Sequence, residues 1–142
     1  MSMVSEIREK LDAIAPPVFN YVAGAAEFAS LTGEPISTPA AFVMTESEAS
    51  AENSRITGSI IQRTETDFAV VIVTRNVSDG TGGAASDDIE DLKQAVRDAL
   101  VGFEPADAEP IEHIEGSLLK ARNGSVWWRE LFGTAYFTTE KT

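Results

Sequence analysis

The residues most able to support chemistry lie in a glycine-rich stretch, residues 80–85, which follows an apolar segment and precedes a helical pattern. Its spacing fits G-x-G-x-x-G/A, in which backbone amides and a helix N-terminus hold the pyrophosphate of a dinucleotide. Asp79, Asp87 and Asp88 oppose that use, because they surround the stretch with negative charge. The apolar segment before it is also typical of half an antiparallel hairpin and not of a parallel βαβ unit. We therefore expect a flexible connecting loop.

A calcium-binding loop is a second candidate in the same region. Asp79 and Glu90 have the spacing of the first and last ligands of an EF-hand loop. Thr81 and Gly83 stand where that pattern needs acids, and Ala84 replaces its turn glycine. We expect a solvated helix start here and no metal ion.

His113 is the only histidine and lies between glutamates in the stretch IEHIE. A histidine and a glutamate can together move a proton. However, the sequence contains no G-x-S-x-G motif, and one histidine does not make a usual zinc site. We expect a structural or surface histidine and, in the chain as a whole, neither a catalytic centre nor a cofactor.

Trp127 and Trp128 point to opposite faces if their segment is a strand. One ring then enters the core. The other, Trp127 by parity, is either exposed at a subunit contact, where tryptophan is enriched, or also buried at the end of a sheet. Both interpretations stand, because parity does not show which face is covered.

Composition narrows the class of partner. The chain has 142 residues, 23 acids against 11 bases, a net charge of −12 and no cysteine. The charge opposes binding to a nucleic-acid backbone or an anionic membrane, and the lack of cysteine favours an intracellular site of assembly. No apolar run approaches the length of a membrane helix. We expect protein partners and one domain that spans residues 1–142.

Apolar spacing predicts two main helices, at residues 4–14 and 89–103. Asp87 and Glu90 have the spacing of a capping box at the start of the second helix, and Gly102 is suited to end it. Segment 18–31 fits either a helix or an extended chain. Five strands are predicted, at residues 40–44, 55–66, 68–73, 111–122 and 125–136. Between them we expect an exposed loop at 46–54, a turn around 65–67 and a hairpin turn at Asn123-Gly124. The expected fold is α+β: a mixed, largely antiparallel sheet of about five strands packed with two main helices.

Several of these patterns occur together along nearly the whole chain, from about residue 3 to residue 137. They are the runs 39–43 (PAAFV), 68–76 (FAVVIVTRN) and 91–105 (DLKQAVRDALVGFEP), with Gln62, Gly116, Trp128, Phe132 and Tyr136. In this combination the chain resembles the tail terminator (tail completion) proteins of long-tailed bacteriophages. It departs from the family at Phe103, where Gly-Trp-x-Pro is frequent and this chain has Gly-Phe-Glu-Pro.

The resemblance implies a structural virion protein and not an enzyme. It implies a hexameric ring that caps the finished tail tube, stops its growth and presents a surface to the head-side connector. Such a protein assembles in the cytoplasm of the bacterial host and ends at the tail–neck junction of the virion. DNA passes through the lumen without specific binding, and an acidic ring would repel its backbone.

For such a ring we expect subunit contacts at sheet edges and at the ends of the second main helix. Candidate interface residues are Arg75, Asn76 and Asp79, around the end of the central strand, and Trp127. Asp87, Asp88, Glu90 and Asp91 are expected to form an exposed acidic patch, a candidate for the lumen side. Other functions stay open: another neck or head-completion protein, a monomeric binding module, and a small nucleotide-binding enzyme that uses residues 80–85.

Overall fold

The computed structural model describes residues 2–76 and 83–141. The elements follow one another as α1 (Met3–Asp12), β1 (Tyr21–Gly24), α2 (Ala25–Ala29), β2 (Ala40–Ser50), β3 (Ile61–Arg75), α3 (Gly83–Leu100), β4 (Glu112–Arg122) and β5 (Ser125–Thr139).

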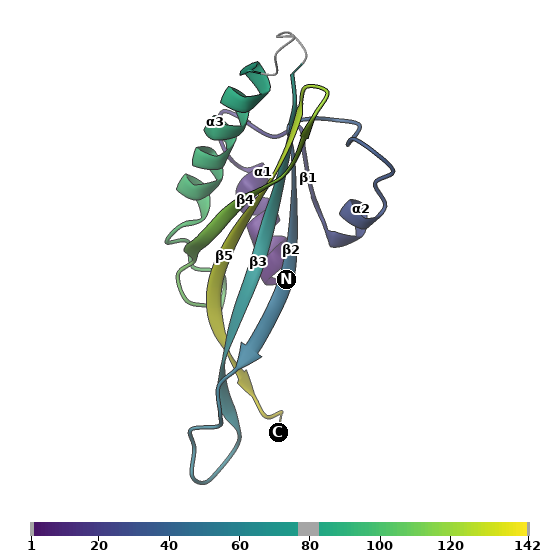
Figure 1. Ribbon diagram of the computed structural model, residues 1–142. Coiled ribbons are helices and arrows are strands. Elements are labelled where there is room, and N and C mark those ends of the chain that lie inside the picture. Colours follow the sequence, from purple (N-terminus) through teal and green to yellow (C-terminus); the bar gives the residue numbers. More distant parts are fainter. Residues whose placement is uncertain (1, 77–82, 142) are drawn as a thin grey trace.

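The five strands form one sheet in the order β1-β2-β3-β5-β4 (Figure 1). Only the short pair β1–β2 is parallel, and the three other pairs are antiparallel. The expected α+β class, with a mixed and largely antiparallel sheet and two main helices, is therefore confirmed.

The helices α1 and α3 cover one face of the sheet, which we call the helical face (Figure 1). Residues of even number in the centre of β3 point to this face and pack under the helices, with Phe68 stacked on Phe132 of β5 at 5.5 Å. Helix α1 adds Ile7 and Leu11, and the apolar side of α3 completes the core. Alternation along a strand places the odd residues of β3 on the other face.

On that second face a smaller core lies between the sheet and the segment that contains α2. Val71 and Val73 of β3 pack there with Phe42 of β2 and Trp127 of β5, and Phe28 of α2 covers them. Both faces of β3 are thus covered, which is why the run 68–73 is apolar at every position.

Two sequence predictions about the strands are wrong in detail, and one open alternative is resolved. No turn interrupts residues 65–67: β3 is one strand of 15 residues, and its polar part is paired on both sides. The expected loop after residue 45 is instead the exposed second half of β2, which continues to Ser50. The undecided segment 18–31 contains both β1 and the short helix α2.

The ends of α3 gave one error and one confirmation. The helix begins at Gly83, so Asp87 lies inside it and does not cap it. Gly102 has a φ of +86° just after the last residue of the helix, as a terminating glycine should. The hairpin turn is also confirmed, because Asn123 and Gly124 both have positive φ between β4 and β5.

Strands β2, β3 and β5 run past the end of the helices and form an arm (Figure 1). Residues 51–60 join β2 to β3 at the far end of the arm, and we call this segment the tip.

Candidate functional site

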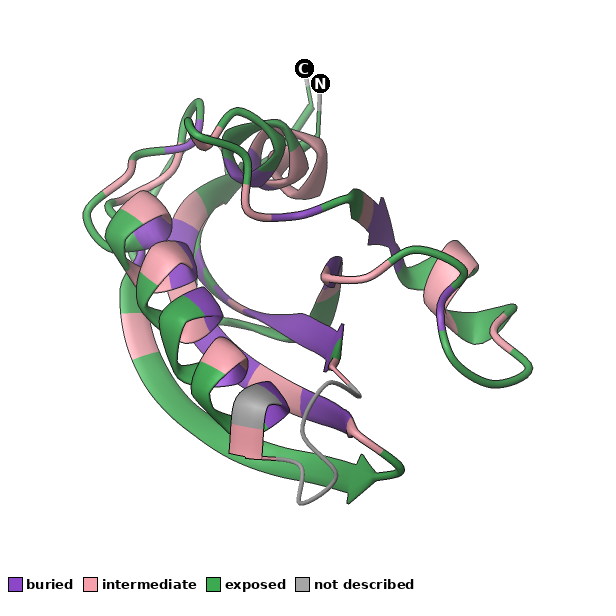
Figure 2. Ribbon diagram, turned by 90° about the horizontal axis from the view of Figure 1, so that it is seen from above, coloured by how far each residue is buried: buried purple, intermediate pink, exposed green. Residues whose placement is uncertain are grey.

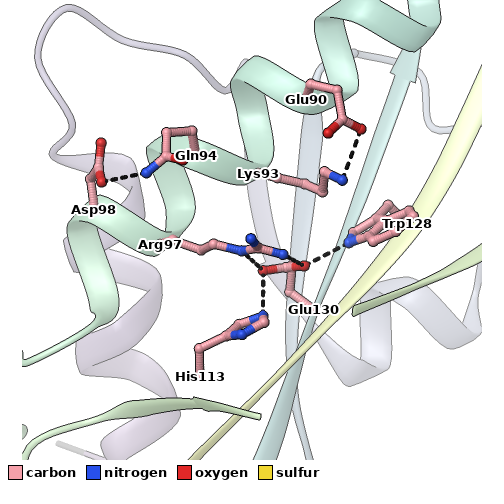
Figure 3. Close-up of polar contacts among 8 residues, drawn as sticks. All are labelled: Glu90, Lys93, Gln94, Arg97, Asp98, His113, Trp128 and Glu130. Carbon is pink, nitrogen blue, oxygen red and sulfur yellow. Dashed lines mark hydrogen bonds and ion pairs between the residues drawn. The ribbon is translucent and has the colours of Figure 1, made fainter. Parts of the chain in front are cut away.

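A buried carboxylate ties β5 to α3 and β4 under the helical face (Figure 3). The side chain of Glu130 has no exposed surface and accepts two hydrogen bonds from Arg97 of α3, at 2.7 and 2.8 Å. The Trp128 indole donates a third at 2.7 Å. His113 Nε2 lies 2.9 Å from the same carboxylate, at ion-pair distance, although it is not aligned for a hydrogen bond.

These contacts fit an ionised and immobile Glu130. Burial raises the pKa of Glu130, but the hydrogen bonds from Arg97 and Trp128 outweigh it, and the net pKa is below the usual value. A carboxylate held in this way is a poor proton donor near neutral pH. The expected structural role of His113 agrees with this setting, since its ring also packs edge-on against Phe132.

A second polar cluster lies on the face away from α1 and α3. Arg129 of β5 pairs with Glu46 of β2 across the intervening strand and with Glu115 of β4. The hydrogen bond from Arg129 lowers the pKa of Glu46. The cluster clamps three strands and contains no chemistry beyond charge pairing.

Exposed apolar side chains gather at the edges of the sheet and at the tip of the arm. Strand β4 is an edge strand whose residues are exposed except for His113, as the long green ribbon of Figure 2 shows. It carries Ile114, Leu118 and Leu119, each about half exposed. The other edge carries exposed Tyr21 on β1 and fully exposed Ile36 in the loop after α2, while Ile56 is fully exposed on the tip.

The predicted interface residues at the end of the central strand lie close to the β4–β5 turn. Arg75 is exposed at the end of β3, opposite Ser125. Asn76 donates a side-chain hydrogen bond of 3.0 Å to Asp88 and so joins this end of β3 to α3. Asp79, together with residues 80–82 of the glycine-rich stretch, lies outside the described residues.

The two tryptophans are both covered within the chain. Trp127 is 7% exposed, and its ring meets Phe28 at 6.2 Å and the Lys120 ammonium at 4.3 Å. Trp128, half-buried on the helical face, lies under the Lys93 ammonium at 3.9 Å. Neither ring is therefore exposed: Trp127 is buried and Trp128 is half-buried.

The four acids of the expected patch lie on the second and third turns of α3. Asp87, Glu90 and Asp91 are exposed and Asp88 is half-buried. Glu90 pairs with Lys93 at 2.8 Å while most of its side chain stays exposed. The patch of acids therefore lies at the surface of the chain.

Sequence reasoning missed the apolar character of the β4 edge. The signal was Leu118-Leu119, two large apolar residues at adjacent positions, which alternation sends to opposite faces unless a bulge intervenes. The structure places an irregularity in pairing between Leu118 and Lys120, and both leucines are exposed. Which strand lies at an edge is decided by tertiary pairing, which the pattern of one strand does not contain.

The described residues, 2–76 and 83–141, contain neither a metal-binding cluster nor a membrane-spanning helix. No group of three or more His, Cys, Asp or Glu residues in this part of the chain is arranged to hold a metal ion. None of the helices found there is long and apolar enough to span a membrane.

The fold and these surfaces define a class: an α+β protein whose buried polar cluster braces its own core and whose exposed sheet edge carries large apolar side chains. The family can be stated as well. The model of the phage tail terminator protein family matches residues 2–142, so the chain belongs to this family of structural phage-tail proteins. The resemblance inferred from the sequence is thereby confirmed.

A solved structure gives the same fold. The chain is similar to one in the virion of a native gene transfer agent particle, with 18% identity and a TM-score of 0.60. The likeness covers 93% of this chain and 92% of the other. A search of curated proteins gives no match.

Proposed function

We propose that this chain forms a hexameric ring on the end of a phage tail tube, stops the growth of the tube and joins it to the head-side connector. Membership of the tail terminator family supports this function, and the fold shared with a chain of a virion particle is consistent with it. The site of action would be the tail–neck junction. The partners would be copies of this chain, the tube protein and a connector protein.

The observation that carries the proposal is the exposed edge strand β4. Among the described strands β4 pairs only with β5, so one side of its 11-residue backbone is open. An unpaired edge of this length that exposes Ile114, Leu118 and Leu119 is a candidate site for association, although Glu112, Glu115, Lys120 and Arg122 also lie on it. The opposite edge of the sheet exposes Tyr21 and Ile36. Copies that join one edge to the other make a heterologous contact, which is the kind that closes into a ring.

Charge fits a conduit for DNA. The net charge of −12 repels a phosphate backbone, so a DNA chain would pass without being held. In this proposal the surface of α3 with Asp87, Asp88, Glu90 and Asp91 faces the lumen. Arg75, Asn76 and Asp79 stay proposed as interface residues, with Arg75 meeting an acidic group of the neighbouring copy. Trp127 is left out of the proposed contact, because its ring is covered within the chain.

The test is a tube-capping assay with a charged edge. Tube protein is polymerised with and without this protein, and tube lengths are measured in negative stain. We expect the native chain to stop growth and the double variant Leu118→Asp, Leu119→Asp to lose this effect while it stays folded, since both side chains are exposed in the free chain. Val101→Asp tests the other expected contact, because Val101 is equally exposed but lies at the end of α3.

Each outcome separates one contact from another. Loss of capping in the β4 variant alone places the subunit contact at the sheet edge. Loss of capping in the Val101 variant alone would place the subunit contact at the end of α3. Tubes of unchanged length with the native protein would contradict the terminator function and favour a different neck component.

A further inference from the structure

The tip of the arm holds the side chain of Ile56 away from the body of the protein, and Ile60, where the tip rejoins β3, is 44% exposed. Ile56 is fully exposed at the tip. The loop that carries it is braced, because the Asn53 side-chain oxygen accepts hydrogen bonds from the backbone N–H groups of Arg55 and Ile61, at 3.3 and 3.1 Å. Gly58, with a φ of +92°, allows the loop to turn back. Burying Ile56 against another surface would be favourable.

A groove of about 340 Å³ lies where the arm leaves the helices. Its apolar lining includes Met3 and Val4 of α1, Ala106 and Ala108 of the loop before β4, and Phe137 of β5. Glu48 and Asp107 add two carboxylates to the same lining. The Tyr136 hydroxyl donates to Glu48 at 2.8 Å and holds that carboxylate in place.

The tip carries one base, Arg55, and one acid, Glu52, and the base is the one next to its apolar side chain. Arg55 precedes Ile56 and, within the described part of the chain, its guanidinium forms no ion pair. Ile56 would thus meet the apolar walls of the groove, and Arg55 beside it would meet the carboxylates of Glu48 and Asp107. In a chain with 11 bases and 23 acids, an unpaired base on the most projecting segment is well placed to find an acidic site on another copy.

We propose that the tip of one copy inserts Ile56 into this groove of the next copy, with Arg55 lying between Glu48 and Asp107. The occupant is a second copy of this chain, and the inference rests on the proposed ring. The contact joins two different surfaces, so it repeats from copy to copy around a closed ring and adds to the contact between sheet edges. The arm then acts as a clasp between neighbours.

Site-specific cross-linking tests this contact, and the absence of native cysteine makes the background clean. The double variant Ile56→Cys, Ala106→Cys is mixed with tail tubes and treated with an oxidant or a short bismaleimide. Both positions are exposed, so the fold should be preserved. We expect a ladder of covalent dimers and higher oligomers on a denaturing gel, and each single-cysteine variant should give none of the higher oligomers.

The matched control is Gln94→Cys, Ala106→Cys. Gln94 is exposed in the middle of α3, away from both sheet edges. It should give no ladder under the same conditions. Arg55→Glu, added to the Ile56→Cys, Ala106→Cys variant, should also abolish the ladder. It would place a third negative charge beside the two carboxylates of the groove.

The failures are distinguishable. Rings on the tubes without a ladder would overturn the clasp and leave the ring function intact. A link formed only within one chain, seen as a monomer that has lost its free thiols, would also overturn the clasp. Absence of any oligomer on tubes that keep growing would overturn the proposed function and the clasp with it.

Discussion

At the scale of single residues, Glu130 connects α3, β4 and β5 through Arg97, His113 and its own strand. Moving a carboxylate out of water is costly, and the bidentate pair with Arg97 offsets that cost. A buried pair of this kind fixes how elements fit together more reliably than it adds net stability. The loss of stability on removing the pair should therefore depend strongly on whether Arg97 alone or both Arg97 and Glu130 are replaced.

We predict that Arg97→Met destabilises the protein by roughly 3 kcal/mol, since it leaves a buried carboxylate without its main partner. The double variant Arg97→Met, Glu130→Leu should recover most of that loss, because no charge remains buried. Urea unfolding followed by tryptophan fluorescence measures both. Equal destabilisation in the single and double variants would show that the pair itself supplies the stability.

The lowered pKa of Glu130 predicts an acid-dependent loss of stability. The unfolded chain takes up the Glu130 proton near pH 4.3, above the pKa of the folded state, so the unfolded state binds more protons in between. The contribution of Glu130 is present above about pH 4.3 and is lost as the pH falls through the folded pKa. The difference in unfolding free energy between the native chain and Glu130→Gln should shrink from pH 6 to pH 3; a constant difference would contradict this assignment.

Gly116 is needed for the close approach of β4 to the Glu130 cluster. A Cβ there would lie 2.5 Å from Glu130 Oε1 and 2.8 Å from Trp128 Cζ2. We expect Gly116→Ala to cost about 1–3 kcal/mol in urea unfolding, as overpacking does. Gly33→Ala is the control, because a Cβ at Gly33 meets nothing within 4 Å and should change stability by under about 0.5 kcal/mol.

At the scale of elements, the β4–β5 turn sets the register of the edge strand. Gly124 has a φ of +81°, where a side chain is strained. Gly124→Ala should therefore destabilise the hairpin by about 1 kcal/mol. Asn123→Gly should be nearly neutral, since glycine also accepts the +53° of that position. Thermal unfolding compares the two, and equal midpoints would show that the turn does not limit stability.

The sequence predicted the elements whose pattern is local. The two main helices, the apolar centre of β3 and the Asn123-Gly124 turn each carry their own signal. The second half of β2 does not, because its side chains are polar and exposed. The first part of β3 was predicted as a separate strand at 55–66, but the strand begins at Ile61 and continues through the expected turn. These two segments are strands because each supplies the backbone partners of the other, and β5 extends the ladder beyond them.

Helix α3 shows a second limit of pattern reading. The acids at residues 87, 88, 90 and 91 were placed at its first turns, but the helix starts four residues earlier at Gly83. Residues 83–86, which form the first turn of the helix, are small, and Ala85 is the buried one among those whose burial is described. Apolar periodicity alone therefore does not reveal this first turn. The side chain of Asp88 is held from outside the helix by Asn76, a contact that only the folded chain brings together.

At the scale of the whole molecule, the candidate surfaces were less predictable than the fold. Trp127 had two possible settings by parity, and its burial depends on α2, an element that the sequence left undecided. The exposed apolar residues of β4 and the tip became visible only once the sheet order was known. Charge, by contrast, is a property of the whole chain, and −12 argued against a nucleic-acid partner before any element was placed.

The proposed ring rests on three features of the chain: an acidic surface, two exposed sheet edges and a projecting arm. The edges and the arm would hold neighbouring copies together, and the acids would keep DNA from adhering. Each part alone is compatible with other proteins. The claim that unites them is that copies of this chain meet in a closed ring on a tube.

End-on electron microscopy of capped tail tubes tests that claim most directly. Purified protein is added to tubes of its cognate tube protein, and images of the tube ends are averaged without imposed symmetry. The account predicts a six-fold ring of this chain on one end of each tube, with an open lumen. Bound protein without rotational order, or bare tube ends at saturating protein, would contradict it.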